Sequence, residues 1–314
     1  MKNKMSRRSF LKMGGAVGAM SIFGGAFIPD LLGKTLNTAY SGEAIDISVV
    51  EGMNYFENTL KAVEVLGGME KFVSKNARVG LLVNSPWKNP GTYTNPDVAL
   101  AAIKMCYDAG AKEIYSIEGA SQAYWNRSNL VEKFSDEIRS LKSYGKKDVK
   151  VEIPRGKNLK KAEVTKDLLE CDVLIDIPIS KDHAGTRFTG TLKNMMGASS
   201  SSTNRFFHLG SGAKDYYGDV EFLSQCIADL NLVRKPDLCI SDATEFVTTN
   251  GPAGPGQIKK AYKIVVGVDR VAVDAYTSTL LGHEPKNVQM IKMANEHGLG
   301  EIDLTKIRIK EMNK

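Results

Sequence analysis

The stretch that decides the fold reads CDVLIDIPISKDH and covers residues 171–183. Its centre, Val173–Ile177, is apolar except for one aspartate. Such near-continuous Val/Ile/Leu runs are typical of strands buried on both faces of a parallel sheet. Pro178 ends the run, and Lys181 and His183 follow within a few residues. The stretch therefore predicts a buried strand that presents charged side chains at its carboxyl end.

Strand-like and helix-like runs alternate on both sides of this stretch. The expected strands are Ile45–Glu51, Arg78–Val83, Glu113–Glu118, Val149–Ile153, Asp172–Ile177, Leu238–Asp242 and Tyr262–Val268. The expected helices are Asn54–Ser74, Pro96–Ala109, Leu130–Ser143, Lys160–Leu169, Val220–Asn231, Val271–Leu281 and Pro285–His297. This order predicts an α/β domain with a mainly parallel, doubly wound sheet flanked by helices. Residues 181–218 lack a clear period and predict a loop-rich excursion from the sheet.

The composition is that of a folded globular protein. Of the 314 residues, 42% are hydrophobic, 25% charged and 8% aromatic, which excludes disordered and fibrous chains. The formal net charge of +6 is concentrated at the N-terminus, because residues 1–40 hold six basic residues and one acidic residue. The rest of the chain is nearly neutral, so no nucleic-acid partner is expected for it.

The N-terminus has the pattern of an export signal. Residues 6–12 read SRRSFLK, and a weakly apolar stretch with five glycines follows over residues 13–28. The paired Arg7 and Arg8, followed by Phe10, resemble a twin-arginine signal. The resemblance implies export by the twin-arginine machinery to the periplasm or to the outer face of the cytoplasmic membrane. A single membrane anchor is the alternative, but the apolar stretch is shorter than the ~20 residues a span needs.

We divide the chain into this signal, residues 1–40, and a single α/β domain, residues 41–314. No distinct cleavage site follows the apolar stretch. Contact with the membrane through an uncleaved signal therefore stays open, and no other membrane contact is expected.

The four cysteines argue against an iron–sulfur cluster. Cys106, Cys171, Cys226 and Cys239 are far apart in sequence, and no C-x-x-C pair is present. Each lies in an apolar pattern, which favours burial as a small hydrophobic residue. No cluster is therefore expected, whereas a bound metal ion stays open because many proteins exported by this route are folded around a cofactor.

Polar and glycine residues gather after nearly every expected strand. Ligands of open parallel sheets bind beyond the carboxyl ends of the strands, so these are the candidate binding residues. They are Asn84, Asp176, Lys181, His183, Asp242, Gly251, Gly254, Asp269 and Asp274. Because loops of this kind also follow strands that bind nothing, the pattern alone leaves a purely structural role open.

The densest group of such residues spans Asp176 to Asn194. Lys181 and His183 follow the strand, and Lys193 and Asn194 come ten residues later at an expected helix start. Ammonium, imidazole and amide groups beside a helix N-terminus would bind an anion. We therefore take Lys181, His183 and Lys193 as the candidate catalytic residues, with a polar loop carrying solvated lysines as the alternative.

His183 also suits a general base or a metal ligand. The candidate metal ligands are Asp176, His183, Asp242 and Asp269. Since no H-x-H, H-E-x-x-H or 2-His-1-carboxylate spacing is present, separate loops would have to assemble such a site and the metal is not specified. His208 is expected to pack in the core or at the surface, with closure over the site as the alternative.

Five stretches of the chain resemble the motifs of a known family and follow one another in the same order. They are VGLLVN at 79–84, CDVLIDIPISKDH at 171–183, TGTLKNMMG at 189–197, GPAG at 251–254 and DRVAVDA at 269–275. From Arg78 onward the chain resembles the domain-of-unknown-function 362 family. The resemblance places these stretches at one site, but the family has no settled activity. Two departures are Leu82, where the family often has lysine, and the lack of the ferredoxin-type clusters that some members carry.

These observations predict an exported protein of unestablished activity. An enzyme with an anion- or metal-dependent site at the strand ends is favoured, with a small anionic ligand as its partner. The alternatives are a non-catalytic protein that binds a cofactor or small anion, and a redox accessory protein without an iron–sulfur cluster of its own.

Overall fold

The computed structural model describes residues 45–143 and 148–313, which belong to one compact unit. The signal residues Arg7, Arg8 and Phe10 and the boundary at residue 40 lie outside the described residues. No described helix is long and apolar enough to cross a membrane.

A seven-stranded mixed sheet with the order β3-β2-β6-β7-β8-β1-β9 forms the centre of the unit. Its strands are β1 (Ile47–Glu51), β2 (Arg78–Val83), β3 (Glu113–Ser116), β6 (Val173–Ile177), β7 (Leu238–Val247), β8 (Ile258–Gly267) and β9 (Ile309–Asn313). Only β8 runs against its neighbours, antiparallel to both β7 and β1. The other pairs are parallel. The predicted mainly parallel α/β fold is therefore confirmed.

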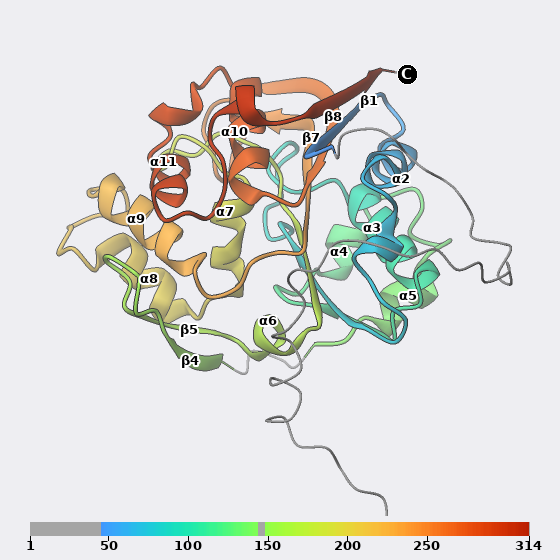
Figure 1. The fold of residues 1–314 in the computed structure, drawn as a ribbon, viewed down its shortest axis with the longest axis horizontal. Helices are drawn as coiled ribbons and strands as arrows, with labels where there is room; N and C mark the ends of the chain where they lie inside the picture. Colours follow the sequence, from blue (N-terminus) through green and yellow to red (C-terminus); the bar gives the residue numbers. More distant parts are fainter. Residues whose placement is uncertain (1–44, 144–147, 314) are drawn as a thin grey trace, which may run out of the picture. The chain divides into compact units, whose positions relative to one another are not determined.

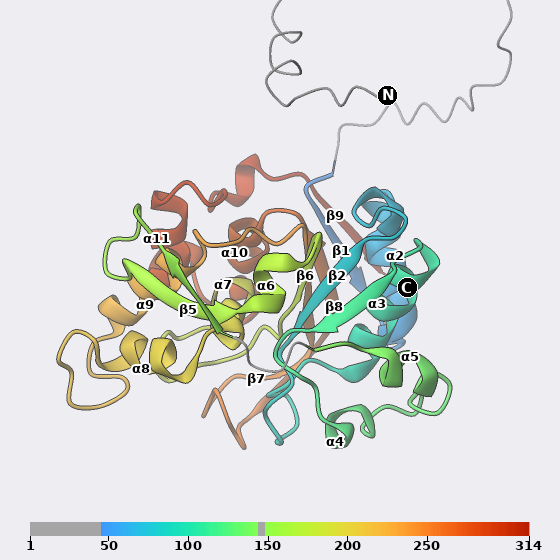
Figure 2. The same ribbon diagram turned by 90° about the horizontal axis from the view of Figure 1, so that it is seen from below.

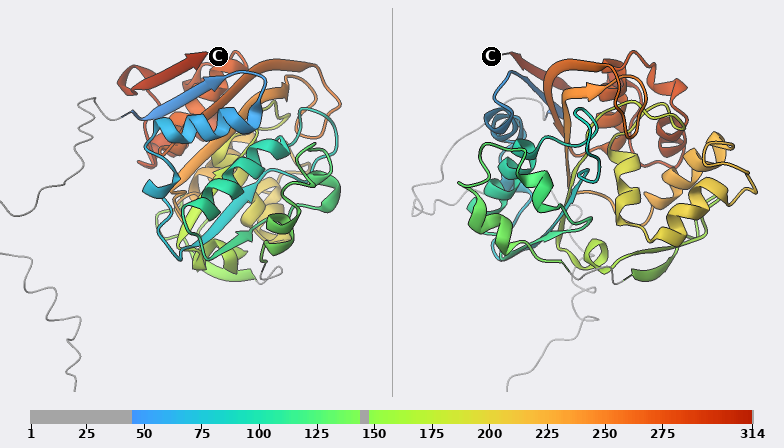
Figure 3. Two further views of the ribbon diagram at one scale, coloured as in Figure 1. Left: turned by 90° about the vertical axis from the view of Figure 1, so that its right-hand side faces the viewer. Right: turned by 180° about the vertical axis from the view of Figure 1, so that it is seen from behind.

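Helices cover both faces of the sheet (Figures 1 and 3). One face carries α2 (Tyr55–Val65), α3 (Pro96–Asp108), α4 (Gln122–Trp125) and α5 (Ser135–Ser140). The other carries α7 (Thr191–Asn194), α8 (Ser201–Leu209), α9 (Val220–Leu230), α10 (Arg270–Leu280) and α11 (Gln289–Glu296), with α6 (Lys166–Glu170) at the bottom of Figure 1. Short 3₁₀ turns are η1 (Met69–Lys71), η2 (Met195–Ala198), η3 (Pro285–Asn287) and η4 (Leu304–Lys306).

Strand β2 has apolar side chains on both of its faces, and helices cover both sides of the sheet in which it lies (Figure 2). Val79, Leu81 and Val83 belong to the core that α2 and α3 complete, whereas Leu82 belongs to the core on the side of α9 and α11. Successive side chains of a strand point to opposite faces, so an unbroken apolar run needs a partner layer on each.

Two regions differ from the sequence expectation. Strand β5 (Lys161–Thr165) occupies the first half of the helix expected over Lys160–Leu169, and it pairs with β4 (Asp148–Glu152) in a separate two-stranded sheet (Figure 1). In β5, Ala162 and Val164 are buried and alternate with outward polar residues, which is the period of a half-buried strand. Strand β9, exposed and charged, was not expected at all because its pattern is that of a surface segment.

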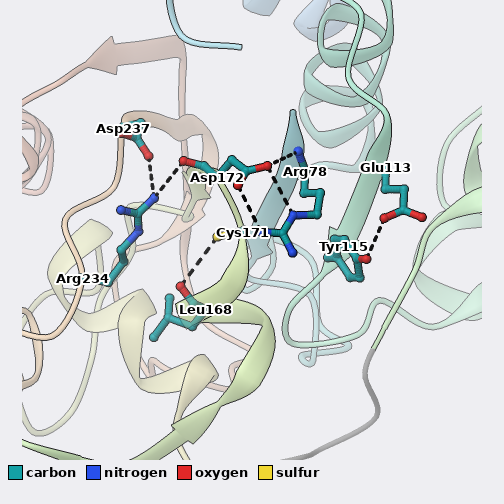
Figure 4. Close-up of polar contacts among 8 residues, drawn as sticks. All are labelled: Arg78, Glu113, Tyr115, Leu168, Cys171, Asp172, Arg234 and Asp237. Atoms are coloured by element: carbon teal, nitrogen blue, oxygen red, sulfur yellow. Dashed lines mark hydrogen bonds and ion pairs between the residues drawn. The ribbon is translucent and has the colours of Figure 1, made fainter. Parts of the chain in front are cut away.

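Charged residues at the starts of the central strands pair with one another (Figure 4). Arg78, the first residue of β2, donates to the carboxylate of Asp172 from its backbone nitrogen (2.9 Å) and from Nη2 (3.1 Å). Arg234 donates to the carbonyl oxygen of Asp172 (3.3 Å) and to the carboxylate of Asp237 (3.1 Å). Asp237 also accepts the N–H of Leu174 (2.8 Å). We call these four charged residues the strand-start network.

Candidate functional site

A cavity of about 330 Å³ lies beyond the carboxyl ends of β2, β3 and β6. Five of the predicted site residues line it together: Asn84, Lys181, His183, Lys193 and Asn194. Glu118, Trp87, Met196 and Tyr217 also line its wall. We call this cavity the strand-end pocket, and its place is the one where open parallel sheets bind ligands.

His183 is a fixed hydrogen-bond donor. It is 4% exposed, and its Nδ1 accepts the backbone N–H groups of Gly185 (3.0 Å) and Thr186 (3.3 Å). An imidazole whose Nδ1 accepts hydrogen bonds carries its proton on Nε2. Burial, together with the charges of Lys193 and Lys181, lowers the pKa of His183 to about 2. The ring is therefore neutral and offers Nε2–H to the pocket.

The general-base role expected for His183 does not fit this arrangement. Its Nε2 already carries a proton, and its Nδ1 faces two N–H donors. A metal ion on Nε2 would push the proton onto Nδ1, against those donors, so the imidazole is also poorly placed as a metal ligand.

Lys181 is a buried cation held in place by backbone carbonyls. Its side chain is fully buried, and its ammonium group donates to the carbonyl oxygens of Thr92 and of Pro252, the latter at 2.9 Å. The same group lies 5.1 Å from the ring centre of Trp87. Burial, followed by the charge of Lys193, lowers the pKa of Lys181 to about 7, while Glu118 opposes that shift. Lys181 therefore titrates near neutral pH.

Lys193 has a much weaker set of partners than Lys181. Among residues 45–143 and 148–313, its Nζ contacts only the thioether sulfur of Met196, at 3.2 Å, and no carboxylate pairs with it. A thioether is a weak acceptor, so the ammonium group is left without adequate acceptors. Burial lowers the pKa of Lys193 to about 8. This side chain is the least satisfied cation of the pocket.

Glu118 is a pocket residue that the sequence reasoning did not select. It follows β3 directly, and burial raises the pKa of its carboxyl group to about 7 against the opposing charge of Lys181. Its Oε2 lies 2.9 Å from the position that a Cβ atom on Gly197 would take. The strand-end rule points to Glu118 because this residue stands at the end of the expected strand Glu113–Glu118, but the resemblance to the family has no motif there and Glu118 was not among the selected site residues.

A chain of buried amides connects the pocket to Asp176. The Nδ2 of Asn194 donates to Asp176 (2.6 Å) and to the carbonyl oxygen of Leu82 (2.9 Å), while Asn84 donates to Asn194 (3.1 Å). Asp176 is completely buried, and burial raises its pKa well above the usual value, which favours the neutral carboxyl group. The Oδ2 atom of Asp176 and the Oδ1 atom of Asn84 have no partner among the described residues.

Asp274 corrects the expectation that the helix start beside Lys193 binds an external anion. Its carboxylate accepts the N–H groups of Thr191 (2.6 Å) and Leu192 (3.0 Å) and the hydroxyl of Thr191 (2.9 Å). The amide donors at the start of α7 are therefore occupied by a carboxylate of the chain itself. Asp274 thereby holds the start of the helix that carries Lys193 and Asn194, and burial raises the pKa of its carboxyl group to about 7.

The remaining predicted carboxylates also serve the fold. Asp242 accepts from the N–H groups of Asn95 (2.6 Å) and Thr244 (2.9 Å), and Asp269 caps α10 and accepts the N–H of Glu301 (2.8 Å). Within the described part of the chain, no three His, Cys, Asp or Glu residues are grouped so that they could hold a metal ion. The candidate ligands Asp176, His183, Asp242 and Asp269 therefore do not form one cluster.

The predicted binding residues Gly251 and Gly254 do not line the strand-end pocket. Gly251 donates to the carboxylate of Asp182 (2.8 Å), and a Cβ atom there would lie 1.8 Å from the carbonyl oxygen of Asp182. This close approach positions Pro252, which lines the pocket and accepts from Lys181. Only a glycine fits at 251, so its role is to bring that loop against Lys181.

The excursion after β6 supplies the outer wall of the pocket. His208, on α8, lines it, donates from Nδ1 to the carbonyl oxygen of Tyr216 (2.8 Å) and stacks on the ring of Tyr216. Tyr217 meets His183 edge to face at 5.6 Å between ring centres. Tyr216 and Tyr217 are 50% and 41% exposed. His208 thus lies in the wall of the pocket, and its closure over the site stays a prediction.

The model of the domain of unknown function DUF362 matches residues 79–279, which is well over half of the chain. The chain belongs to the DUF362 family. A model of the twin-arginine translocation signal matches residues 4–24, so the N-terminus of this DUF362 protein carries a signal for twin-arginine export. A curated relative is a thylakoid-associated protein of Synechocystis sp., 24% identical over an alignment of 270 residues, which covers 81% of this chain and 79% of that protein.

Two solved structures are distantly similar to this DUF362 protein. One is the lactate racemase apoprotein from Thermoanaerobacterium thermosaccharolyticum, with a TM-score of 0.37, 12% identity and coverage of 70% of this chain and 54% of that one. The other is a protein from Thermotoga maritima, with a TM-score of 0.36, 15% identity and coverage of 78% and 60%. Likenesses of this degree carry no statement about ligand or reaction.

Proposed function

We propose that the exported DUF362 domain binds a small anionic metabolite in the strand-end pocket and acts on it by proton transfer. The observation that carries the proposal is the ammonium group of Lys193, which lines a cavity of about 330 Å³ and has only a thioether as its hydrogen-bond partner among the described residues. A partly buried ammonium group with only a weak acceptor is costly, and an anionic ligand would supply a strong one.

The other donors of the pocket support the same ligand chemistry. Lys181 places a second positive charge beside the cavity, and the neutral His183 offers an N–H group. Trp87 and Tyr217 add apolar surface. A pocket of this size with few convergent polar groups suits a small organic anion.

Proton transfer is supported by two groups that titrate near neutrality. Burial raises the pKa of Glu118 to about 7 and lowers that of Lys193 to about 8. An acid or base works best when its pKa lies near the working pH, and environments that move unlike groups toward neutrality are typical of active sites. In this proposal Glu118 and Lys193 exchange protons with the ligand, while His183 and Lys181 orient it.

Binding without turnover is the second candidate function. It is favoured by one observation on His183. Its Nδ1 accepts two backbone N–H groups and its Nε2 carries the proton, so the imidazole can orient a ligand but cannot remove a proton from it. Retention of ligand without formation of product would support this reading.

Thermal unfolding of the exported protein with and without small anions tests the proposal. Propionate, phosphate and sulfate are suitable probes, and at least one should raise the unfolding midpoint in proportion to the logarithm of its concentration. Lys193→Met should remove the effect. Lys150→Met, which changes a side chain that is 84% exposed, is the matched control and should keep it. If no probe stabilises the wild-type protein, the proposal fails.

A further inference from the structure

The two lysines of the strand-end pocket differ in a way that anion binding alone does not explain. Lys181 is anchored by two carbonyl oxygens, whereas Lys193 rests on the sulfur of Met196 at 3.2 Å. An ammonium group held by two carbonyl oxygens is fixed in place and suits the recognition of a charged ligand group. An amine held only by a weak acceptor is free to approach a ligand atom and to form a bond with it.

Resting on the proposed anion pocket, we infer that Lys193 is a nucleophile that forms a Schiff base with a small carbonyl acid of the 2-oxo acid class. The carboxylate of the ligand would lie against Lys181 and the Nε2–H of His183. The carbonyl group would then lie at Lys193. Lysine amines become nucleophiles in apolar surroundings or beside another cation, and Lys193 has both.

The position of Glu118 completes the arrangement. Lys193 and Glu118 both lie against the turn η2, the former on Met196 and the latter over Gly197, where a Cβ atom would come within 2.9 Å of the carboxylate. Because Gly197 has no side chain, the carboxyl group can lie close to the turn that carries the amine. Glu118 is therefore the acid that can serve the same ligand.

The reaction balances without a further reactant. The neutral Nζ of Lys193 attacks the carbonyl carbon, the C–N bond forms as the C=O π bond breaks, and one proton passes from nitrogen to oxygen to give a carbinolamine. Glu118 then protonates the hydroxyl group, which leaves as water as the nitrogen lone pair forms the C–N double bond, and the second nitrogen proton passes back to Glu118. One amine and one carbonyl group thus give one imine and one water.

The ionisation of the pocket is compatible with this chemistry. The charged and titratable groups that face Lys193 are Lys181, His183, His208 and Glu118. Burial lowers the pKa of Lys193 from its usual 10.5 to about 8. Near pH 7.5 the neutral amine is then roughly a hundredfold more abundant than in an ordinary lysine.

Reductive trapping tests the inference. The exported protein is incubated at pH 7.5 with pyruvate and sodium cyanoborohydride, and the modified peptide is identified by mass spectrometry. One adduct per chain at Lys193 is expected, at least about tenfold faster than at exposed lysines such as Lys150, because only the pocket holds the ligand beside the reacting amine. An excess of propionate, which has no carbonyl group, should slow the trapping by competition.

The variant Lys193→Arg separates the inference from the function on which it rests. Arginine keeps the positive charge but is not a nucleophile, so propionate should still raise the unfolding midpoint while trapping by pyruvate is lost. Lys150→Arg should behave as wild type in both measurements. Stabilisation of the wild-type protein by propionate without an adduct at Lys193 would overturn the Schiff base and keep the anion pocket. Neither stabilisation nor adduct would overturn both, and the mapping on the wild-type protein does not depend on how the variants fold.

Discussion

At the start of β2 and β6, Arg78 and Asp172 face each other across neighbouring strands, and each finds a partner of opposite charge. At the ends of the same strands, Lys181 and Lys193 line one cavity, and neither forms an ion pair with a described carboxylate. The side chains of Arg78 and Asp172 are 38% and 49% exposed, whereas Lys181 is fully buried. The two ends of the sheet thus hold similar residue types in opposite surroundings.

The two ends of the sheet shift the pKa values of their charged side chains in different ways. In the strand-start network, hydrogen bonds from Arg78 lower the pKa of Asp172 below its usual value, which favours the charged form. In the strand-end pocket, burial moves Lys181, Lys193 and Glu118 toward neutrality, which penalises the charged form. Burial penalises a charge that lacks matching partners, and in the proposed function an anionic ligand would supply such partners to the two lysines.

Asp274→Ala should have the largest effect on stability of any change at the strand-end pocket. The substitution leaves two buried N–H groups and the hydroxyl of Thr191 without their acceptor. Each such loss costs about 1–3 kcal/mol, so the free energy of unfolding should fall by about 3–5 kcal/mol. Urea unfolding measures it. A loss below about 1 kcal/mol would contradict the role of Asp274 as the internal acceptor of α7.

The carboxyl end of β6 was predictable because one physical rule covers it. A buried apolar run ends at Ile177, and the rule that ligands bind beyond such ends selected Lys181 and His183. Lys193 and Asn194 were selected from the same segment, although their helix was expected to bind the anion with its N-terminus. Asp274 overturned that detail, and a partner 83 residues away in the chain cannot be read from local sequence.

Other parts of the site depend on tertiary packing that no local pattern contains. Glu118 follows a short strand, and its altered pKa arises from burial beneath residues remote in sequence. The tautomer of His183 is set by the backbone of Gly185 and Thr186, so the sequence could suggest a base where the structure has a donor. Likewise, β5 was taken for a helix because its alternation is short and leads directly into α6.

The affinity of the strand-end pocket for an anion should fall steeply as the pH rises. Below pH 7 both lysines are charged and Glu118 is neutral, while above pH 8 the lysines lose their protons and Glu118 is ionised. All three changes disfavour an anion, so binding of propionate should weaken more than about tenfold between pH 6 and pH 9. His183 stays neutral throughout this range because its pKa is about 2.

Isothermal titration calorimetry at several pH values measures this dependence. Around pH 7.5, repeating the titration in buffers of different ionisation enthalpy should reveal proton uptake on binding, because a bound anion raises the pKa of both lysines. Binding to the strand-end pocket that is independent of pH, with no proton uptake, would contradict the predicted ionisation.

Removing one positive charge at each end of the sheet should change stability in opposite directions. Lys193→Met deletes a buried ammonium group without acceptors, so the unliganded protein should gain about 1–2 kcal/mol. Arg78→Met deletes a half-exposed partner of Asp172 and should cost about 0.5–1 kcal/mol, less in high salt. Urea unfolding without ligand compares the two variants. Two losses of similar size would show that the lysine, like the arginine, stabilises the fold.

The smallest expected effect comes from Asp176→Asn, for which Asp172→Asn is the matched control. Asp176 is completely buried, and burial raises its pKa well above the usual value, which favours a neutral side chain. An amide keeps its shape and the acceptor for Asn194, and the change in unfolding free energy at pH 7 should stay within about 0.5 kcal/mol.

The control removes a charge that the fold uses. Asp172→Asn gives up the ion pair with Arg78, so its cost should be about 1 kcal/mol at pH 7 and should shrink at low pH, as the wild-type carboxylate becomes protonated. The sign follows from the lowered pKa of Asp172, whose stabilising effect is present above the unfolded value and lost as the pH falls. Urea unfolding at pH 3 and pH 7 distinguishes the two aspartates. A larger loss for Asp176→Asn than for Asp172→Asn at pH 7 would mean that the buried carboxyl group is ionised, and that the strand-end pocket already holds a counter-charge for it.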